Sequence, residues 1–334
     1  MNPVFSDIFD GNLLDNNTTN GLGSDDLIVL DNGSDSSDGG AGNDLIFGNG
    51  GNDTLVGGAG IDTLNGGDGN DVITSDGDGG TYRGDAGNDT LFSGIGTETM
   101  DGGADIDTID HTAFAGNYVF NMTTGLTNFG GESFINFENA NMGAGNDSVT
   151  GNASANLING GAGNDTLVGG AGIDTLNGGA GNDTLEGGLG QDSLTGGTGN
   201  DFFRLTEVSL ISLPSPNPIN PQSRDLITDF SVPADTIILA NSLDSTLAGL
   251  ISPGIKGLSF VGGNLAGNVL DPLWFFKGAG LDGRLLGNAS GIYVNTIDGN
   301  IWYNDANAAG SYLIANVGPN VAFGMTNADF VYGL

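Results

Sequence analysis

Acidic residues recur at every ninth position over two long stretches of the chain. These positions hold Asp44, Asp53, Asp62, Asp71, Asp89 and Asp107 in the first stretch, and Asp147, Asp165, Asp174, Asp183, Asp192 and Asp201 in the second. Carboxylates are hard oxygen donors, and Ca²⁺ accepts about six to eight such oxygens, including backbone carbonyls, in flexible geometry. A long series of carboxylates at a fixed period therefore predicts a repeated calcium site.

The acids belong to a nine-residue pattern, GGxGxDxUx, in which U is apolar. Eight units run without a slip over residues 39–110, and seven more run over residues 142–204. Position 6 is Asp in twelve of these fifteen units and Glu98 in one, and the exceptions are Gly80 and Asn156. Position 8 is apolar or aromatic in all fifteen units, which a disordered Gly/Asp linker has no reason to maintain.

This pattern resembles the RTX, or haemolysin-type, calcium-binding nonapeptide repeat. The resemblance implies a parallel β-roll in which six residues form a turn, three form a short strand, and two units complete one coil. Glycine at positions 1, 2 and 4 allows the positive φ of a tight turn, and Asn or Asp at positions 5 and 6 tolerates it. Strand alternation points position 8 into a thin core and position 7 outward, where Thr54, Thr63, Thr166, Thr175 and Thr184 stand.

The expected fold is all-β, with a parallel β-roll in two blocks followed by a β-rich C-terminal capping domain. We expect a lead-in with one isolated repeat at residues 1–38, a first roll at 39–110, an insert at 111–141, a second roll at 142–204, and a cap and secretion-signal region at 205–334. The isolated repeat, residues 20–28, is offset from the first run by one residue. His111, the only histidine, lies in the insert and has no second imidazole with which to form a metal centre.

Stacked coils lie about 4.8 Å apart, so the carboxylates of units n and n+2 form columns on two edges. At that spacing two charges repel by roughly 1 kcal/mol in water and about three to four at an effective dielectric of 20, which Ca²⁺ between the turns reverses. An Asp that only caps its own turn does not explain so regular a column. The series Asp53 to Asp107 and Asp147 to Asp201 predict three ions each, and Asp44/Asp62 and Asp174/Asp192 one each, about eight in all. Weaker sites are expected beside Gly80 and Asn156.

The pattern changes beyond residue 204. Residues 225–230 (DLITDF) and 234–239 (ADTIIL) resemble the strands that cap the roll in RTX proteins of the serralysin type, and residues 291–305 resemble the hairpin that follows. A solenoid needs such a cap over its last coil. Bulky side chains gather here, which we interpret as core rather than a ligand groove: Phe230, Trp274, Phe275, Phe276, Trp302, Tyr303 and Phe323.

The C-terminal residues 329–334 (DFVYGL) resemble the uncleaved type I secretion signal of this family. The resemblance implies a type I secretion ABC transporter as a partner. It also implies a secreted, extracellular protein that is either released or retained at the cell surface.

Composition excludes several classes of partner. The chain carries 41 acidic and 6 basic residues, a formal net charge of −35, and 31 of the acids precede residue 204 with Arg83 as the only base among them. Such a polyanion is not expected to bind nucleic acid or anionic lipid, and it requires cations to compensate its self-repulsion. There is no cysteine, and no apolar run has the length of a membrane span.

The expected function is that of a secreted calcium-binding protein, structural, cell-surface or adhesive in role, whose repeats fold when Ca²⁺ binds. We expect no enzyme, because the sequence has no HExxH, GxSxG or P-loop motif. The alternative is an RTX-type exported hydrolase or toxin-related protein with an unrecognised active site. A narrower ice-binding or carbohydrate-binding role is disfavoured, since position 3 of the repeats is mostly Ala and Thr198 is its only threonine.

Overall fold

The computed structural model describes residues 8–10, 18–94, 96–205, 225–240, 269, 275–278, 291–305 and 310–333. The chain divides into two compact units, unit 1 with residues 1–152 and 157–161, and unit 2 with residues 153–156 and 162–334. Nearly every described element is a β-strand, the exceptions being α2 (Pro319–Gly324) and the 3₁₀ turn η2 (Asn327–Asp329). The predicted all-β class is confirmed. No helix in the described part of the chain is long and apolar enough to cross a bilayer.

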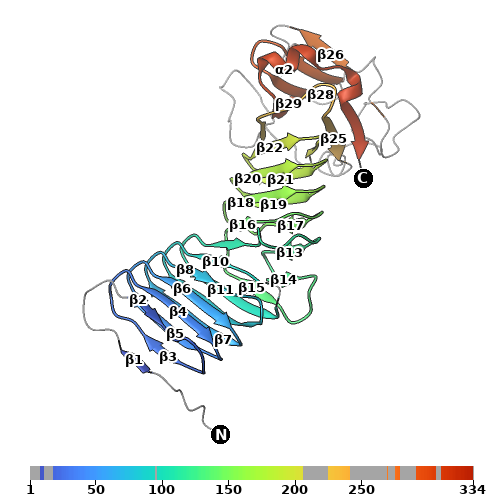
Figure 1. The fold of residues 1–334 in the computed structure, drawn as a ribbon. Helices are drawn as coiled ribbons and strands as arrows, with labels where there is room; N and C mark the ends of the chain where they lie inside the picture. The colour runs from blue at the N-terminus through green and yellow to red at the C-terminus, as the bar shows by residue number, and fades with distance from the viewer. Residues whose placement is uncertain are drawn as a thin grey trace. The chain divides into compact units, whose positions relative to one another are not determined.

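Unit 1 consists mainly of two parallel sheets between which the chain alternates (Figure 1). Sheet 1 is formed, in order, by β1 (Ile8–Asp10), β3 (Leu27–Val29), β5 (Leu45–Gly50), β7 (Asp62–Asp68), β9 (Gly80–Ala86), β11 (Glu98–Ala104) and β15 (Ser133–Ile135). Sheet 2 is formed by β2 (Thr18–Asn20), β4 (Ser36–Ala41), β6 (Thr54–Ala59), β8 (Val72–Thr74), β10 (Thr90–Phe92), β12 (Thr108–Asp110), β16 (Asn139–Asn141) and β18 (Leu157–Ala162). A smaller sheet 3 contains β14 (Leu126–Thr127), β13 (Val119–Asn121) and β17 (Ser148–Thr150).

The register of these sheets confirms that two nine-residue units make one coil. Thr54 pairs with Val72 in sheet 2, and Leu45 pairs with Thr63 in sheet 1, so partners are 18 residues apart. The coils begin before residue 39, because Ile28 pairs with Ile46. The one-residue offset expected for the early repeat is therefore wrong, and residues 18–38 form coils of the same roll.

The segment 111–141 interrupts the period but not the stacking. Strand β15 pairs with β11, and β16 pairs with β12, both in parallel. Strand β13 pairs with β17 in parallel and with β14 in an antiparallel hairpin. The segment therefore contributes strands to all three sheets of unit 1.

Unit 2 combines parallel coils with an antiparallel meander. Sheet 4 is formed, in order, by β20 (Thr175–Ala180), β22 (Ser193–Thr198), β24 (Asp225–Ile227), β29 (Gly310–Asn316), β28 (Asn300–Asp305), β27 (Gly291–Asn295) and β26 (Phe275–Gly278). Sheet 5 is formed by β19 (Thr166–Gly172), β21 (Thr184–Gly190), β23 (Phe202–Leu205), β25 (Thr236–Ala240) and β30 (Phe330–Gly333).

The two segments expected to follow the repeats do stack on the last coils. Strand β24 pairs with β22, and β25 pairs with β23, both in parallel. Strands β27 and β28 form an antiparallel hairpin, and Phe230 and Trp302 are buried in the core of the unit. Trp274 lies outside the described residues.

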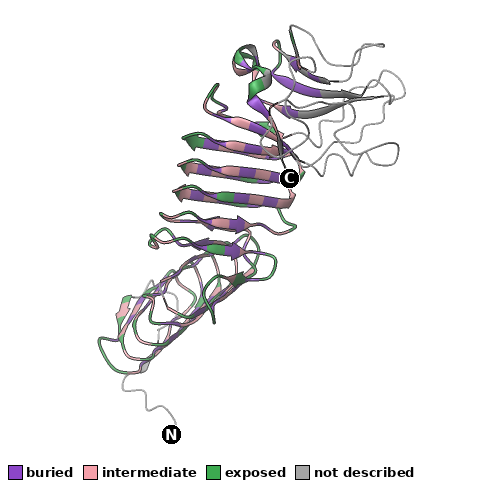
Figure 2. Cartoon of the chain, turned by 90° about the vertical axis from the view of Figure 1, so that its right-hand side faces the viewer, coloured by how far each residue is buried: buried purple, intermediate pink, exposed green. Residues whose placement is uncertain are grey.

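The core of the coils consists of the position-8 side chains, which come alternately from the two sheets. Every one of the fifteen, from Ile46 to Phe203, has a relative exposure of 0%. Figure 2 shows the resulting alternation of buried and more exposed residues along the strands. The position-7 threonines point outward as predicted: Thr54, Thr63, Thr166 and Thr175 are exposed, and Thr184 is half-buried.

Glycine serves two different purposes in the turns. At positions 2 and 4 it provides left-handed backbone, as at Gly58 (φ 88°) and Gly60 (φ 143°). Gly57 at position 1 does not have a positive φ, and neither do Asn52 and Asp53 at positions 5 and 6, so the conformational reason predicted for these positions is wrong. A side chain at Gly57 would instead lie closer than 3.0 Å to the Asp62 carboxylate. Position 1 needs glycine because a carboxylate occupies the adjacent space.

Candidate metal centre

The position-6 carboxylates form hydrogen-bonded ladders along the edges of the coils. In column 1 (Asp53, Asp71, Asp89 and Asp107), each backbone N–H donates to Oδ1 of the next aspartate, at 2.7–2.8 Å. Column 2 (Asp44 and Asp62) has the same bond at 2.9 Å. The predicted alignment of units n and n+2 is thus present in unit 1.

Unit 2 repeats this arrangement. Column 3 (Asp165, Asp183 and Asp201) has N–H to Oδ1 distances of 2.8 and 2.9 Å, and column 4 (Asp174 and Asp192) has one of 2.9 Å. Asn156 also joins column 4 through its backbone, because its N–H donates to Asp174 Oδ1 at 2.8 Å. Asp147, the remaining predicted residue, lies in unit 1 and accepts the Tyr118 N–H at 2.8 Å.

The second carboxylate oxygen of these residues is buried and unsatisfied. Among the described residues, no hydrogen-bond partner exists for Oδ2 of Asp44, Asp53, Asp62, Asp71, Asp89, Asp107, Asp174, Asp183 and Asp192. Each of these side chains has a relative exposure of 2% or less. A buried carboxylate oxygen without a partner is costly, so the arrangement calls for a cation that the chain itself does not provide.

The space beside most of these orphaned oxygens is lined by a second oxygen. At Gly39 the position of a Cβ atom would lie closer than 3.0 Å to both Asp44 Oδ2 and the carbonyl oxygen of Gly57, one coil further on. Gly48 stands in the same relation to Asp53 Oδ2 and the Gly66 carbonyl. A carboxylate and a carbonyl oxygen thus converge between successive turns. These are the hard donors that Ca²⁺ prefers, so the residues present fit calcium.

The same convergence occurs in unit 2. Gly178 is flanked by Asp183 Oδ2 and by the Gly196 carbonyl, which lies 2.7 Å from the Cβ position. No three acidic or histidine side chains gather into one cluster in the described part of the chain. Coordination between the coils would therefore depend on main-chain carbonyls together with one or two carboxylates.

Burial makes these carboxylates poor anions in the absence of metal. Desolvation raises the pKa of several aspartates to about 6, with a further upward contribution from neighbouring carboxylates and a downward one from the ladder N–H: Asp53, Asp62, Asp71, Asp89, Asp174 and Asp183. The pKa of Asp107 rises to about 7 for the same reasons. The metal-free columns therefore oppose folding at neutral pH.

The ladders include carboxylates that the repeat pattern missed. Asp26 donates its N–H to Asp44 Oδ1, and Asp35 donates to Asp53 Oδ1, both at 2.8 Å. Downstream, the ladders continue with acceptors brought in by longer spacings: Asp107 N–H to Glu138 (3.1 Å), Asp192 N–H to Asp225 (3.3 Å) and Asp201 N–H to Asp235 (3.0 Å). Asp26 had a sequence signal, since it lies 18 residues before Asp44 and is followed by two apolar residues.

His111 is separate from the columns. Its ring is buried against Tyr118 and Phe134, with ring centroids 4.3 and 5.3 Å apart, and neither nitrogen has a hydrogen-bond partner among the described residues. Desolvation lowers its pKa to about 4, so the ring is neutral at physiological pH. It packs as part of an aromatic cluster.

Comparison with known proteins identifies the repeats. Residues 47–82, 77–109, 143–176 and 168–203 match the RTX calcium-binding nonapeptide repeat. The chain thus carries four copies of a calcium-binding repeat model, and these include all twelve of the predicted aspartates except Asp44. Fold and site together define a calcium-binding repeat protein.

Among solved structures, the chain is similar to the AlgE6R2 subunit from the Azotobacter vinelandii mannuronan C5-epimerase. The two share 20% identity over 55% of this chain and 91% of that chain, with a TM-score of 0.33. No curated protein sequence matches the chain.

Proposed function

We propose that this chain is a secreted calcium-binding protein whose coils fold when Ca²⁺ neutralises the carboxylate columns. The observation that carries the proposal is the series of buried Oδ2 atoms without partners, most of them beside a carbonyl oxygen of the next coil. Bringing these carboxylates together without a cation costs desolvation and repulsion at every turn. Calcium binding and folding are consequently one equilibrium.

The proposed stoichiometry is about eight ions, one for each space between consecutive carboxylates of the predicted columns. Asp26 and Asp35 each extend a column by one residue, which allows further ions at the upstream end. Extracellular modules commonly bind calcium at about 10⁻⁴ to 10⁻³ M. The coils are therefore expected to be unfolded at cytosolic calcium levels and folded outside the cell.

The test is far-UV circular dichroism of the full chain in EDTA, in millimolar Mg²⁺ and in millimolar Ca²⁺, followed by metal counting after dialysis. Strand signal is expected to appear with Ca²⁺ but not with Mg²⁺, which demands a stricter octahedral geometry. Identical spectra in EDTA and in Ca²⁺ would contradict the proposal. A count far below eight would restrict binding to part of the columns.

We further propose export by a type I secretion ABC transporter that recognises the C-terminal region. The support is the resemblance of residues 329–334 to the signal of this family. In cells expressing such a transporter, removing residues 329–334 is expected to retain the protein inside, whereas removing residues 1–6 is expected to leave export unchanged. Equal export of both truncated chains would refute the assignment.

The proposed role is structural or adhesive rather than catalytic. In the described repeats, the position-6 aspartates are committed to ladders that join one coil to the next. A rigid, calcium-dependent roll suits an extracellular spacer or surface attachment. Fractionation of a culture into cytosol, surface and medium, with and without calcium, distinguishes a released protein from one held at the surface.

A further inference from the structure

The sheet 1 edge of unit 1 changes chemistry after Asp62. The next three coils place Gly80, Glu98 and Glu132 where aspartates stand elsewhere, as the registers of β7, β9, β11 and β15 show. None of these positions has the short carboxylate of the repeat. Hydroxyl and N–H groups nevertheless bond both oxygens of Glu98 and Oε2 of Glu132, in contrast to the orphaned Oδ2 atoms of columns 1 and 2.

Glu98 is fully buried and bonded on both oxygens. Ser93 Oγ donates to Oε2 at 2.7 Å, and Oε1 accepts the hydroxyl of Ser75 and the N–H of Gly94. Both serines occupy position 1 of their units, where the regular repeat has glycine and an open cradle. A hydroxyl group thus fills the space that the glycine of a regular repeat leaves open beside its carboxylate.

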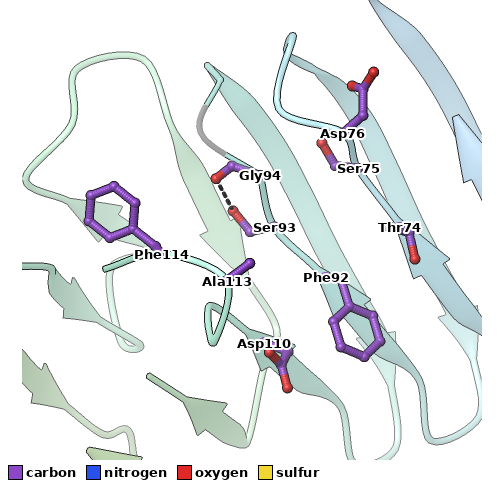
Figure 3. Close-up of a pocket in the computed structure, with 9 residues that line it drawn as sticks. All are labelled: Thr74, Ser75, Asp76, Phe92, Ser93, Gly94, Asp110, Ala113 and Phe114. Carbon is purple, nitrogen blue, oxygen red and sulfur yellow. Dashed lines mark hydrogen bonds between the residues drawn. The ribbon is translucent and has the colours of Figure 1, made fainter. Parts of the chain in front are cut away.

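Figure 3 shows the two serines at the turns that follow β8 and β10, beside Asp76, Phe92 and Phe114. They line a hollow of about 380 Å³. Their hydroxyls are already used by Glu98, so this hollow does not present them to a ligand. The serines act inward, toward the buried carboxylate.

At Gly80 a tyrosine replaces the missing carboxylate. The fully buried Tyr82 donates its hydroxyl to the Gly79 carbonyl at 3.0 Å. Its oxygen would lie 2.6 Å from a Cβ atom on Gly80. The phenol therefore occupies the place of an aspartate side chain in this coil, and it carries no charge that needs a metal.

Glu132 completes the series at the next coil. Its Oε2 accepts hydroxyl bonds from Tyr118 and Thr127, both at 2.6 Å. Tyr118 also stacks on the buried His111, and Phe134 of β15 packs on the same ring. Large aromatic side chains bury about 150–250 Å² each and so add apolar burial around Glu132.

We propose that these groups form a calcium-independent clamp, the hydroxyl clamp, which ties β11 to the turns after β8 and β10, and the start of β15 to β13 and β14, without metal. It comprises Ser75, Tyr82, Ser93, Glu98, Tyr118, Thr127 and Glu132. The clamp proposal rests on the proposed function, because it identifies coils that stay together without the calcium that the other coils require. Hydroxyl donors satisfy the buried carboxylates permanently, so removing calcium releases the columns but not the clamp. Unit 1 then refolds outward from this end when calcium returns.

Hydrogen–deuterium exchange of the full chain, resolved by mass spectrometry, compares strands of one sheet in EDTA and in Ca²⁺. Strands β5 and β7 are expected to be unprotected in EDTA and protected in Ca²⁺, whereas β11 and β15 are expected to be protected in both. The expected difference between β11 and β7 in EDTA is about tenfold or more in exchange rate, the factor that one hydrogen bond to a charged group supplies.

Variants at Glu98 test the assignment. Glu98→Ala is expected to abolish the protection of β11 in EDTA, and Glu98→Gln to retain it, because the amide can still bond the serines. The triple variant Ser75→Gly, Ser93→Gly and Glu98→Asp restores the repeat pattern, and it is expected to make the protection of β11 depend on calcium.

The outcomes separate the two proposals. Equal, rapid exchange of β7 and β11 in EDTA, with protection of both in Ca²⁺, overturns the clamp and leaves the proposed function standing. Absence of any calcium response in β5 and β7, with β11 protected throughout, overturns the proposed function and leaves the clamp standing. If Glu98→Ala fails to fold even in Ca²⁺, the Glu98→Gln variant is the test instead. Loss of β11 protection in EDTA in this variant also overturns the clamp.

Discussion

Asp71→Asn is expected to have opposite effects with and without calcium. Asp71 lies inside column 1, where Oδ1 accepts the Asp53 N–H and Oδ2 has no hydrogen-bond partner among the described residues. Asparagine keeps an oxygen for the ladder and removes the charge. The substitution therefore separates the hydrogen-bonding role of this residue from its metal-binding role.

The magnitude follows from the pKa and from the number of ions that share the carboxylate. Burial first, and then neighbouring carboxylates, raise the pKa of Asp71 from 3.8 to about 6, so its charge costs the metal-free roll about 3 kcal/mol at neutral pH. Asp71→Asn is expected to recover part of this in EDTA. At calcium ten times above the dissociation constant, each site contributes about 1.4 kcal/mol, so weakening two sites removes up to about 3 kcal/mol.

The assay is far-UV circular dichroism at pH 7.5, as the strand signal in EDTA and as urea unfolding in Ca²⁺, together with metal counting. The control is Asp68→Asn, because Asp68 is exposed and its side chain is in no column, yet the change in net charge is the same. Asp71→Asn should increase the strand signal that remains in EDTA, lower the urea midpoint in Ca²⁺ and lose about two ions. Less strand signal in EDTA, together with a lower urea midpoint in Ca²⁺ and no ion lost, would show that Asp71 only caps its own turn.

Three further outcomes follow from the same geometry. The calcium-free roll should gain strand signal as pH falls from about 7 to about 4.5. The pKa of Asp53 is about 6 in the folded state and 3.8 in the unfolded state, so folding takes up a proton between these two pH values and is favoured as pH falls. The apparent calcium affinity should fall over the same pH range. Gly48→Ala places a Cβ against Asp53 Oδ2 and should lose at least one ion by metal counting, unlike Gly130→Ala, where nothing lies within 4 Å. Asp229→Ala should lower the free energy of urea unfolding of the calcium-bound protein by about 1–3 kcal/mol, because the Asp229 carboxylate accepts the Gly196 N–H at 2.9 Å. An unchanged free energy of unfolding would show that this hydrogen bond does not stabilise the protein.

The sequence predicted the coils and columns because both depend on short spacings. An 18-residue coil places each Asp beside the one two units away, and strand alternation directs position 8 inward. The repeat pattern missed Asp35 because position 8 of its unit is Ser37, whose buried hydroxyl accepts a hydrogen bond from Thr19 at 3.0 Å. A pattern that requires an apolar residue there does not find it.

The nine-residue spacing did not predict the carboxylates that reach the ladders through loops of other lengths. Glu138 follows Asp107 by 31 residues, and Asp235 follows Asp201 by 34, yet both accept the N–H that an 18-residue partner would accept. Position-1 glycine was expected for the wrong reason, because a positive φ is a backbone property, whereas the observed constraint is a carboxylate of the same unit and a carbonyl of the next coil. Such constraints between coils require coordinates.

The departures from the repeat have a common physical meaning. In a regular coil one residue both accepts the ladder N–H and brings a buried charge, so the hydrogen bond is available only where the charge is neutralised. Asn156 uncouples the two by removing the charge, while its N–H still joins the ladder at Asp174. Glu98 uncouples them by satisfying the charge with serine hydroxyls. Because each departure lowers the local demand for a cation, we expect their positions to set where along the chain calcium controls folding and where it does not.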